Sequence, residues 1–342
     1  MWDYLKTTEK PILLYGMGNG ADRVLDELQR RQIPVQGVFA SDGFVRSQVF
    51  RGFTVISYSE AKARFGDMVV LLCFGTQRPE VLEQIRLMAR EQEVYAPDVP
   101  VIGDGLFTRD YARRHREELE QVYAALADEQ SRLVFRSVVE YKITGRIQLL
   151  FDCETPPEEA FETILCLGEQ ENYLDLGAYT GDTIAEFLRH TGGRYGHIYA
   201  AEPDEKTFRK LQQNTAELAN CQLFPVGIGD RWEQLPFAAR GGRNSAVGQA
   251  GRLQQMDSVD NLLYGRPVSY IKVDVEGQEA AFIRGAAKTI TRHRPKMLLS
   301  AYHRTEDLFA LPLQVLALQP DYRLYLRHHP YLPAWDVNYY FV

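Results

Sequence analysis

The sequence predicts an α/β protein with two parallel sheets and a helical segment between them. Two regions, residues 11–104 and 171–342, alternate short apolar runs with amphipathic helical patterns, which is typical of parallel sheets. Residues 108–168 instead carry apolar residues at helical spacing, without a strand-like run. The chain has 342 residues, a length that favours two domains. We therefore expect an α/β domain, a helical linker and a second α/β domain at residues 1–107, 108–170 and 171–342.

The composition is that of an ordinary globular protein, with 45% hydrophobic and 25% charged residues. The net charge of −7 argues against a nucleic-acid-binding chain, and no apolar run approaches the ~18 residues of a membrane span. The four cysteines form no C-x-x-C pair, which favours neither a zinc site nor a disulfide framework, and the first ten residues lack the pattern of a secretory signal. We expect a cytoplasmic protein without a nucleic-acid partner, and a homo-oligomer is compatible with the sequence.

In the first region a glycine turn follows the first predicted strand. Gly16, Gly18 and Ala21 have the spacing G-x-G-x-x-A and open a helix, which is the context of a nucleotide-binding turn. Asp42, after the second strand, could hold a ribose. The pattern resembles the small Rossmann-like domains of sugar-modifying enzymes, which bind nucleotide-sugars. The alternative is a scaffold in which the glycines serve only tight packing. The predicted strands lie at residues 11–16, 35–40 and 68–75, and the helices at 23–31 and 79–90.

The helical segment is expected to break near residues 128–131, where aspartate or serine can cap a helix. Its charged face at residues 113–120 is interpreted as solvated surface. The segment is predicted to connect the two domains and to pack over the ligand cleft of the second.

The second region contains seven predicted strands. Only a loop separates the last two, too short for a parallel crossover, so these two strands should form an antiparallel hairpin at the sheet edge. Seven strands with a reversed final strand are the layout of a Rossmann-like methyltransferase fold. The strands are predicted at residues 173–176, 197–201, 221–226, 269–273, 296–301, 322–326 and 337–341.

A second glycine turn, N-Y-L-D-L-G-A-Y-T-G-D at residues 172–182, follows the first of these strands. A side chain at Gly177 or Gly181 would keep the backbone away from a bound ligand. Glu202 ends the next strand, where an acidic side chain can accept two hydrogen bonds from a ribose diol. The alternative for each acidic residue is structural, with Asp175 as a helix cap and Glu202 as a solvated strand end.

Three charged residues, Lys272, Asp274 and Glu276, follow a central strand, at the edge where open α/β sheets carry their active sites. The alternative is a structural Lys–Asp pair with Glu276 in the first turn of a helix. His303 follows the next strand and should reach the same edge, so His303 and Asp274 are candidate proton acceptors.

His303 is open to two other interpretations. It could be a structural histidine, or it could join Asp274 and Glu276 as a ligand of a divalent metal. We expect no metal. His328 and His329 are interpreted as solvent or rim residues of the final hairpin loop.

Together these motifs resemble the FkbM family of S-adenosylmethionine-dependent methyltransferases. The resemblance covers residues 171–342, and its most distinctive piece is K-V-D-V-E-G at residues 272–277. It rests on Y-L-D-L-G-A-Y-T-G-D-T, Y-A-A-E-P-D, V-G-I-G-D, M-D-S-V-D-N-L, Y-I-K-V-D-V-E-G-Q-E and R-P-K-M-L-L-S-A-Y-H, in the order found in the family. Tyr179 departs from the pattern, because a small or polar residue such as Asn is common at that position.

The resemblance implies a class I methyltransferase fold, S-adenosylmethionine as methyl donor, and a hydroxyl of a sugar or glycan as acceptor. Asp274 would lie beside the transferred methyl group. Glu202 would hold the ribose of the donor, Asp230 the adenine, and the glycine turn the methionine part. The donor-binding residues would be Asp175, Gly177, Ala178, Gly181, Asp182, Thr183, Glu202, Pro203 and Asp230.

An S-adenosylmethionine-dependent O-methyltransferase is therefore the leading hypothesis. The alternatives are an NAD(P)- or nucleotide-sugar-binding oxidoreductase that uses the Gly16 turn, and a non-catalytic nucleotide-binding module. The pairing of Glu202 and Asp230 with K-V-D-V-E-G is left unexplained by the oxidoreductase hypothesis. The acceptor pocket is predicted to be built from loops at residues 237–256 and 328–336.

Overall fold

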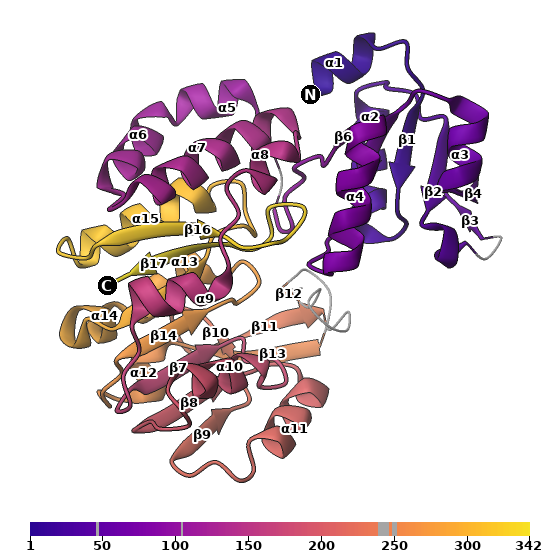
Figure 1. The fold of residues 1–342 in the computed structure, drawn as a ribbon. Helices are drawn as coiled ribbons and strands as arrows, with labels where there is room; N and C mark the ends of the chain where they lie inside the picture. The colour runs from indigo at the N-terminus through magenta and orange to yellow at the C-terminus, as the bar shows by residue number, and fades with distance from the viewer. Residues whose placement is uncertain (46–47, 104, 239–245, 248–251) are drawn as a thin grey trace.

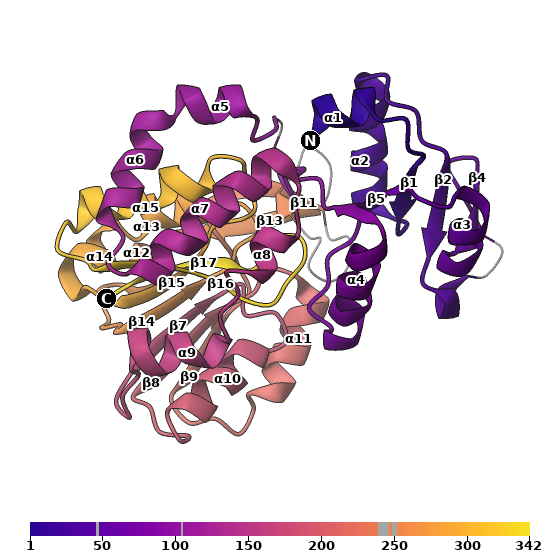
Figure 2. The same cartoon turned by 45° about the horizontal axis from the view of Figure 1, so that its top comes forward.

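A computed structural model describes residues 1–45, 48–103, 105–238, 246–247 and 252–342. It contains a smaller N-terminal sheet and a larger C-terminal sheet, with a helical segment beside the second (Figure 1). Figure 2 shows the N-terminal sheet to one side of the larger one, with the helices α7 and α8 near the C-terminal hairpin. Among the described helices, none is both long and apolar enough to cross a lipid bilayer.

The N-terminal sheet has the strand order β3-β4-β2-β1-β5-β6. Every pairing in it is parallel except that of β3 with β4. The helix α2 is amphipathic and buries Val24, Leu25 and Leu28 against this sheet. The elements are α1 (Trp2–Thr7), β1 (Ile12–Tyr15), α2 (Asn19–Arg30), β2 (Gly37–Ala40), β3 (Val49–Phe50), β4 (Phe53–Ser57), α3 (Tyr58–Phe65), β5 (Val69–Leu72), α4 (Pro79–Glu91) and β6 (Glu93–Tyr95).

The predicted break in the helical segment is confirmed. Helix α7 (Glu129–Thr144) begins at Asp128, whose carboxylate accepts a hydrogen bond from the backbone N–H of Ser131 at 2.7 Å. The guanidinium of Arg327 reaches from the C-terminal hairpin and pairs with the carboxylates of Asp128 and Glu159 at 2.7 and 2.9 Å. These ion pairs hold the segment on the larger sheet. Its other elements are α5 (Arg109–Arg114), α6 (Arg116–Ala125), α8 (Gln148–Phe151), α9 (Pro157–Ala160) and the π-helical turn η2 (Phe161–Leu165).

All seven strands predicted for the second region are present: two have the predicted bounds, and the ends of the other five are shifted by at most two residues. Their order is β16-β17-β15-β14-β7-β8-β9, and β17 runs antiparallel to both of its neighbours. The predicted closing hairpin is thus confirmed. The strands are β7 (Asn172–Leu176), β8 (His197–Ala201), β9 (Cys221–Phe224), β14 (Tyr270–Val273), β15 (Lys296–Ser300), β16 (Leu324–His328) and β17 (Val337–Phe341).

Helices connect these strands and cover the sheet. They are α10 (Asp182–His190), α11 (Glu205–Asn214), α12 (Val259–Leu263), α13 (Glu279–Gly285), α14 (Ala287–His293) and α15 (Asp307–Leu318). One apolar cluster contains residues of the N-terminal sheet, of α7 and of the C-terminal hairpin together, including Leu13, Val138 and Leu326. The division into separate domains at residues 107 and 170 stays a prediction.

The prediction of a loop at residues 237–256 is wrong at both ends. The strands β11 (Glu233–Ala238) and β13 (Arg252–Asp257) pair antiparallel in a small sheet with β10 (Gly227–Ile228) and β12 (Ala246–Val247). The sequence hides β13 because its residues are mostly polar: Leu253 is exposed, and of the side chains that the structure describes between 253 and 257 only that of Met256 is buried. The part of the predicted loop at residues 239–245 and 248–251 lies outside the described residues.

Candidate functional site

A cavity of about 440 Å³ opens at the carboxyl edge of β7, β8 and β14, a size typical of small-molecule sites. Six of the predicted site residues line it: Gly177, Asp182, Thr183, Glu202, Pro203 and Asp274. Five predicted residues do not line it: Asp175, Ala178, Gly181, Asp230 and His303. The parallel pairing of β7 with β8 and β14 brings these strand ends together, as the alternation of strands and helices predicts.

Gly177 is required for packing between strands. Its φ is +80°, and a side chain there would meet the carbonyl oxygen of Asp274 at 2.0 Å. The close atom belongs to the end of β14, so this contact alone accounts for the glycine, and room for a ligand at Gly177 stays a prediction. Gly181 has a φ of +90° at the start of α10 and faces the Leu211 side chain.

Tyr179 adopts a left-handed backbone conformation, with a φ of +48°. Asparagine tolerates that conformation better than a bulky residue does, which explains physically why Tyr179 is a departure from the family pattern. The Tyr179 side chain is partly exposed and lines the cavity.

Asp175 lies behind the cavity, completely buried. Its carboxylate accepts a hydrogen bond from the Thr183 hydroxyl in the first turn of α10, and it lies 4.0 Å from the Lys272 ammonium. Burial raises the pKa of Asp175, and the nearby Lys272 opposes that rise. Asp175 therefore links the strand β7 to the helix that follows it.

Glu202 is buried and receives two backbone hydrogen bonds. One carboxylate oxygen accepts from the N–H of Tyr179 at 3.1 Å and the other from the N–H of Asp204 at 2.8 Å. Burial raises the pKa of Glu202 to about 7, and the two amides only partly oppose the rise. Glu202 thus joins the glycine turn to the end of β8 and is no solvated strand end.

Asp230 is held by a different partner. Its carboxylate accepts a hydrogen bond from Nε of Arg284, at 3.1 Å, outside the cavity lining. The neighbouring backbone of Gly227 and Ile228 does line the cavity. Contact between Asp230 and an adenine stays a prediction.

Asp274 lines the cavity at the charged carboxyl end of β14. The Lys272 ammonium lies 3.8 Å from its carboxylate, and the Tyr302 hydroxyl donates to both of its oxygens at 3.2 and 3.3 Å. Part of the Asp274 side chain remains exposed to the cavity. The structural Lys–Asp pair is therefore present, and it leaves Asp274 accessible to a ligand.

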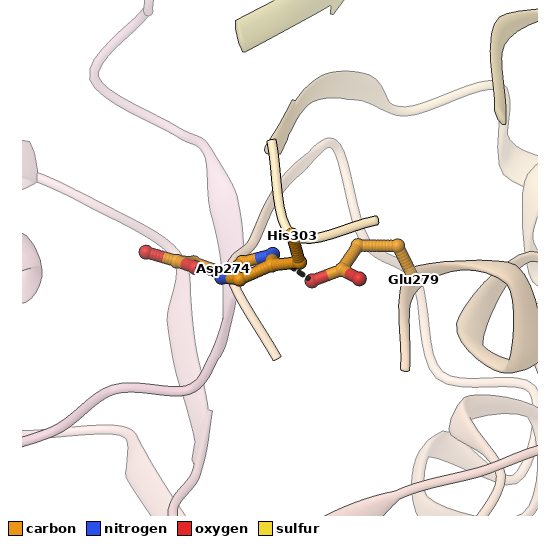
Figure 3. Close-up of side chains that lie close together, drawn as sticks. All are labelled: Asp274, Glu279 and His303. Carbon is orange, nitrogen blue, oxygen red and sulfur yellow. Dashed lines mark ion pairs between the residues drawn. The ribbon is translucent and has the colours of Figure 1, made fainter. Parts of the chain in front are cut away.

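His303 is almost fully buried between carboxylates (Figure 3). Its Nε2 lies 3.4 Å from Asp274 and 3.4 Å from Glu276, and its Nδ1 lies 3.0 Å from Glu279. Although burial lowers it, these three carboxylates raise the pKa of His303 well above its ordinary value. The surroundings favour a charged, positioning imidazolium over a proton acceptor.

Asp274, Glu279 and His303 lie close enough together to be considered as metal ligands. However, Nδ1 of His303 faces Glu279 and Nε2 faces Asp274, and the lone pairs of the two ring nitrogens point in divergent directions. No single ring nitrogen therefore faces both Asp274 and Glu279, and the absence of a metal stays a prediction.

Sequence reasoning missed Glu279, which is the last residue of the quoted D-V-E-G-Q-E run. The only signal for it was a third carboxylate in that run, spaced to fall on the first turn of α13. It also missed Gln77, which lines the cavity although it lies in the N-terminal region, between β5 and α4. A lone glutamine after a strand carries no sequence signal of a site.

Gln77 reaches the cavity because its loop is paired with the final hairpin. The backbone N–H of Thr76 donates to the Leu332 carbonyl at 2.7 Å, and the N–H of Leu332 donates back at 2.9 Å. Gly75 lies so close to the Trp335 ring that a side chain there would meet it at 2.5 Å. The loop after β5 is therefore held against the hairpin loop, and both contribute to the cavity lining, through Gln77 and through His329 and Asp336.

The prediction that His328 and His329 are rim residues is wrong. Both are buried: His328 ends β16, and His329 hydrogen-bonds the Tyr340 hydroxyl at 2.7 Å while lining the cavity. Burial lowers the pKa of His328 to about 3, so this histidine is neutral. The extension of β16 to His328, beyond the predicted strand end, brings both rings inside the fold.

The sequence model of the protein family described as the methyltransferase FkbM domain matches residues 175–333 of this chain. A crystal structure of the methyltransferase FkbM from Methylobacillus flagellatus KT is 21% identical in sequence, with a TM-score of 0.75, and the match covers 100% of this chain and 92% of that one. That structure shares the fold over the whole chain, including the N-terminal sheet.

More distant matches cover about half of the chain. Fibrillarin from Aeropyrum pernix, solved with S-adenosyl-L-methionine bound, is 17% identical, with a TM-score of 0.33, over 52% of this chain and 69% of that one. An rRNA methylase from Streptococcus thermophilus gives 17% identity and a TM-score of 0.33 over 51% and 87%. No curated protein matches the sequence. Residues 175–333 thus match the methyltransferase FkbM domain, and that match together with the shared fold supports a methyltransferase activity.

Proposed function

We propose that the protein transfers a methyl group from S-adenosylmethionine to a hydroxyl of a sugar or glycan-type acceptor. The observation that carries this proposal is the acidic cavity at the carboxyl edge of the larger sheet. Seven carboxylates line it, against the two cationic side chains Arg189 and Lys272: Asp182, Glu186, Glu202, Asp204, Asp274, Glu276 and Asp336. Such a lining suits a sulfonium cation and disfavours the pyrophosphate of a dinucleotide.

The donor end of the proposed site is the side of the cavity that contains Gly177, Glu202 and Pro203. Glu202 would accept hydrogen bonds from the ribose diol, and the turn from Gly177 to Thr183, including Ala178, Gly181 and Asp182, would surround the methionine part. Asp175 would support that turn from behind through Thr183. The bound donor supplies an electrophilic methyl group, and the protein supplies orientation.

Asp274 is the proposed proton acceptor. A sugar hydroxyl is a poor nucleophile until its proton is taken, and Asp274 is the carboxylate exposed to the cavity beside Lys272 and Tyr302. As the acceptor oxygen attacks the methyl carbon, its proton would pass to Asp274. His303 would serve by holding Asp274 in place, since it does not line the cavity.

The acceptor would enter between the hairpin loop and the N-terminal sheet, where Gln77, His329 and Asp336 line the cavity. A contribution of the N-terminal region to acceptor capture is supported by the Thr76–Leu332 pairing. The sugar class itself rests on the resemblance of the sequence motifs to the family. A nucleotide-sugar at the Gly16 turn remains part of this proposal. A cytoplasmic location fits the four cysteines, all of which are free thiols.

The donor is tested by calorimetric titration of the protein with S-adenosylmethionine, S-adenosylhomocysteine, NAD and UDP-glucose. We expect both sulfur compounds to bind and NAD not to bind. Binding of NAD without S-adenosylmethionine would instead favour an oxidoreductase. UDP-glucose that binds the wild type and no longer binds the folded Gly18→Asp variant would assign a nucleotide-sugar site to the N-terminal turn.

The reaction is tested by methyl transfer from isotopically labelled S-adenosylmethionine to a panel of mono- and oligosaccharides. We expect label on a sugar oxygen, identified by mass spectrometry after hydrolysis of the product. The matched control is Asp274→Asn, which keeps the shape of the side chain and removes the proton acceptor. Label on nitrogen or carbon would contradict O-methylation.

A further inference from the structure

We propose that Glu279 is a positioning residue for methyl transfer, which acts through His303 to hold Asp274 at the cavity. This inference rests on the proposed function, in which Asp274 accepts the proton of the acceptor hydroxyl. Nothing in the sequence motifs assigns a role to Glu279.

One carboxylate oxygen of Glu279 holds two parts of the site together. Glu279 lies in the first turn of α13 and is 1% exposed. Its Oε1 accepts hydrogen bonds from the N–H groups of Val275 and Gly277, at 3.1 and 3.3 Å, and lies 3.0 Å from Nδ1 of His303. Glu279 thus fixes the turn that follows Asp274 and the ring that faces Asp274.

The turn needs such support because its backbone is unusual. Glu276 has a φ of +50°, a conformation that costs a residue other than glycine free energy and persists only where the surroundings hold it. Gly277, with a φ of +86°, adopts its conformation without that cost. The segment before α5 also covers the turn, since the N–H of Ile102 donates to the His303 carbonyl at 2.9 Å. The Ile102 side chain packs against Gly277.

His303 transmits the effect of Glu279 to the cavity. Its ring lies between Glu279 on one side and Asp274 on the other (Figure 3). Nε2 also lies 3.4 Å from Glu276, and Asp307 of α15 is a further buried carboxylate nearby. A buried carboxylate at Nδ1 fixes the orientation of a histidine ring and stabilises its charged form. The charged ring then lies beside Asp274, as Lys272 does, and keeps the Asp274 carboxylate oriented.

The primary test is Glu279→Gln, a nearly isosteric change that keeps an oxygen for the two backbone amides and removes the charge at Nδ1. The readout is nitrogen-15 NMR of the His303 ring in the full chain, titrated from pH 6 to 9. We expect a doubly protonated ring at neutral pH in the wild type and a singly protonated ring in Glu279→Gln. Glu306→Gln, an exposed change near α15, is the matched control and should leave the ring charged.

The second readout separates a positioning role from a structural one. We expect the methyl-transfer rate of Glu279→Gln to fall by about 10–100-fold, the usual effect of removing a carboxylate that orients a functional histidine, while S-adenosylmethionine affinity stays within about twofold. Glu279→Asp, which keeps the charge, should recover part of the rate. It also serves as the second variant if Glu279→Gln fails to fold.

Three outcomes would overturn the proposal: a neutral His303 in the wild type, a ring that stays charged in Glu279→Gln, or a folded Glu279→Gln with an unchanged rate. Loss of activity on chelation with recovery in magnesium or manganese would also overturn it, because a metal would then fix the ring. A protein that binds no S-adenosylmethionine would defeat the proposed function instead. The NMR titration would still decide whether Glu279 sets the charge of His303.

Discussion

The two glycine turns of this chain look alike in sequence and differ in what surrounds them. Each follows a parallel strand and opens a helix. A side chain at Gly177 would strike the Asp274 carbonyl at 2.0 Å, and one at Gly20 would strike the Cys73 carbonyl at 2.3 Å. In both regions a glycine allows the end of a neighbouring strand to pack closely against the turn. Glycines at these positions therefore indicate close packing, and by themselves they do not show whether a turn binds a ligand.

The surrounding side chains make the difference. At the Gly177 turn, Glu202 and Asp274 are acidic residues that line a cavity. At the Gly16 turn the Phe74 ring lies against the glycine, and the carboxylate of Asp42 bonds the Ser59 hydroxyl at 2.7 Å. Each region thus has an acidic residue at the end of its second strand. Asp42 of the N-terminal region bonds a neighbouring side chain, whereas Glu202 of the C-terminal region lines a cavity.

The largest effect is expected for Asp274→Asn. Removing the proposed proton acceptor should lower the methyl-transfer rate by about 10²–10⁴-fold, while S-adenosylmethionine affinity changes little. Initial rates and calorimetry measure the two quantities separately. The same change at an acidic residue of the N-terminal region, Asp42→Asn, should leave both unaltered. Near-normal turnover in Asp274→Asn would remove it from the chemistry.

Glu202→Ala should weaken S-adenosylmethionine binding by about 1.5–3 kcal/mol, the usual contribution of hydrogen bonds to a charged group. Because Glu202 also bonds the amides of Tyr179 and Asp204, Glu202→Gln is the better-matched variant and should lose part of that affinity. Asp42→Ala is the control from the other turn. If Glu202→Ala and Asp42→Ala lowered S-adenosylmethionine affinity equally, the proposed difference between the two turns would be wrong.

S-adenosylmethionine affinity should depend on pH through Glu202. Burial raises the pKa of Glu202 to about 7. A ribose diol that donates to the carboxylate favours its ionised form, so the pKa is lower in the complex and binding releases a proton. Affinity should therefore be constant above about pH 7 and fall by up to about tenfold per pH unit below it. Calorimetry across pH 5.5–8.5 measures this, and Glu202→Gln should abolish the dependence.

The smallest effect is expected for Gly18→Asp. Gly18 has a φ of +118°, so the substitution strains the fold by about 1–3 kcal/mol, but S-adenosylmethionine affinity should stay within about twofold of the wild type. Gln77→Ala is the matched change where the N-terminal sheet does reach the cavity, and it should raise the acceptor KM without affecting the donor. A folded Gly18→Asp protein that cannot bind S-adenosylmethionine would show that both regions build one donor site.

The sequence predicted most of the scaffold of the site. Apolar runs alternating with helices indicate parallel strands, and parallel strands gather their carboxyl ends at one edge. That rule brings Glu202 and Asp274 to one cavity and puts Asp175 directly behind it. The helix break before α7 and the antiparallel closing hairpin were also predictable, because they rest on local capping and on loop length. Whether the predicted residues bind the donor stays a prediction.

What only the tertiary structure decided are the properties that depend on partners distant in the chain. One example is the burial of His303 among Asp274, Glu276 and Glu279. Others are the buried rings of His328 and His329 and the backbone pairing of Thr76 with Leu332. The sequence shows the residue type and its local element, and these set which atoms are available. The charge of a histidine or carboxylate depends on the desolvation and the neighbouring charges it meets in the fold, and those arise from contacts that no local pattern encodes.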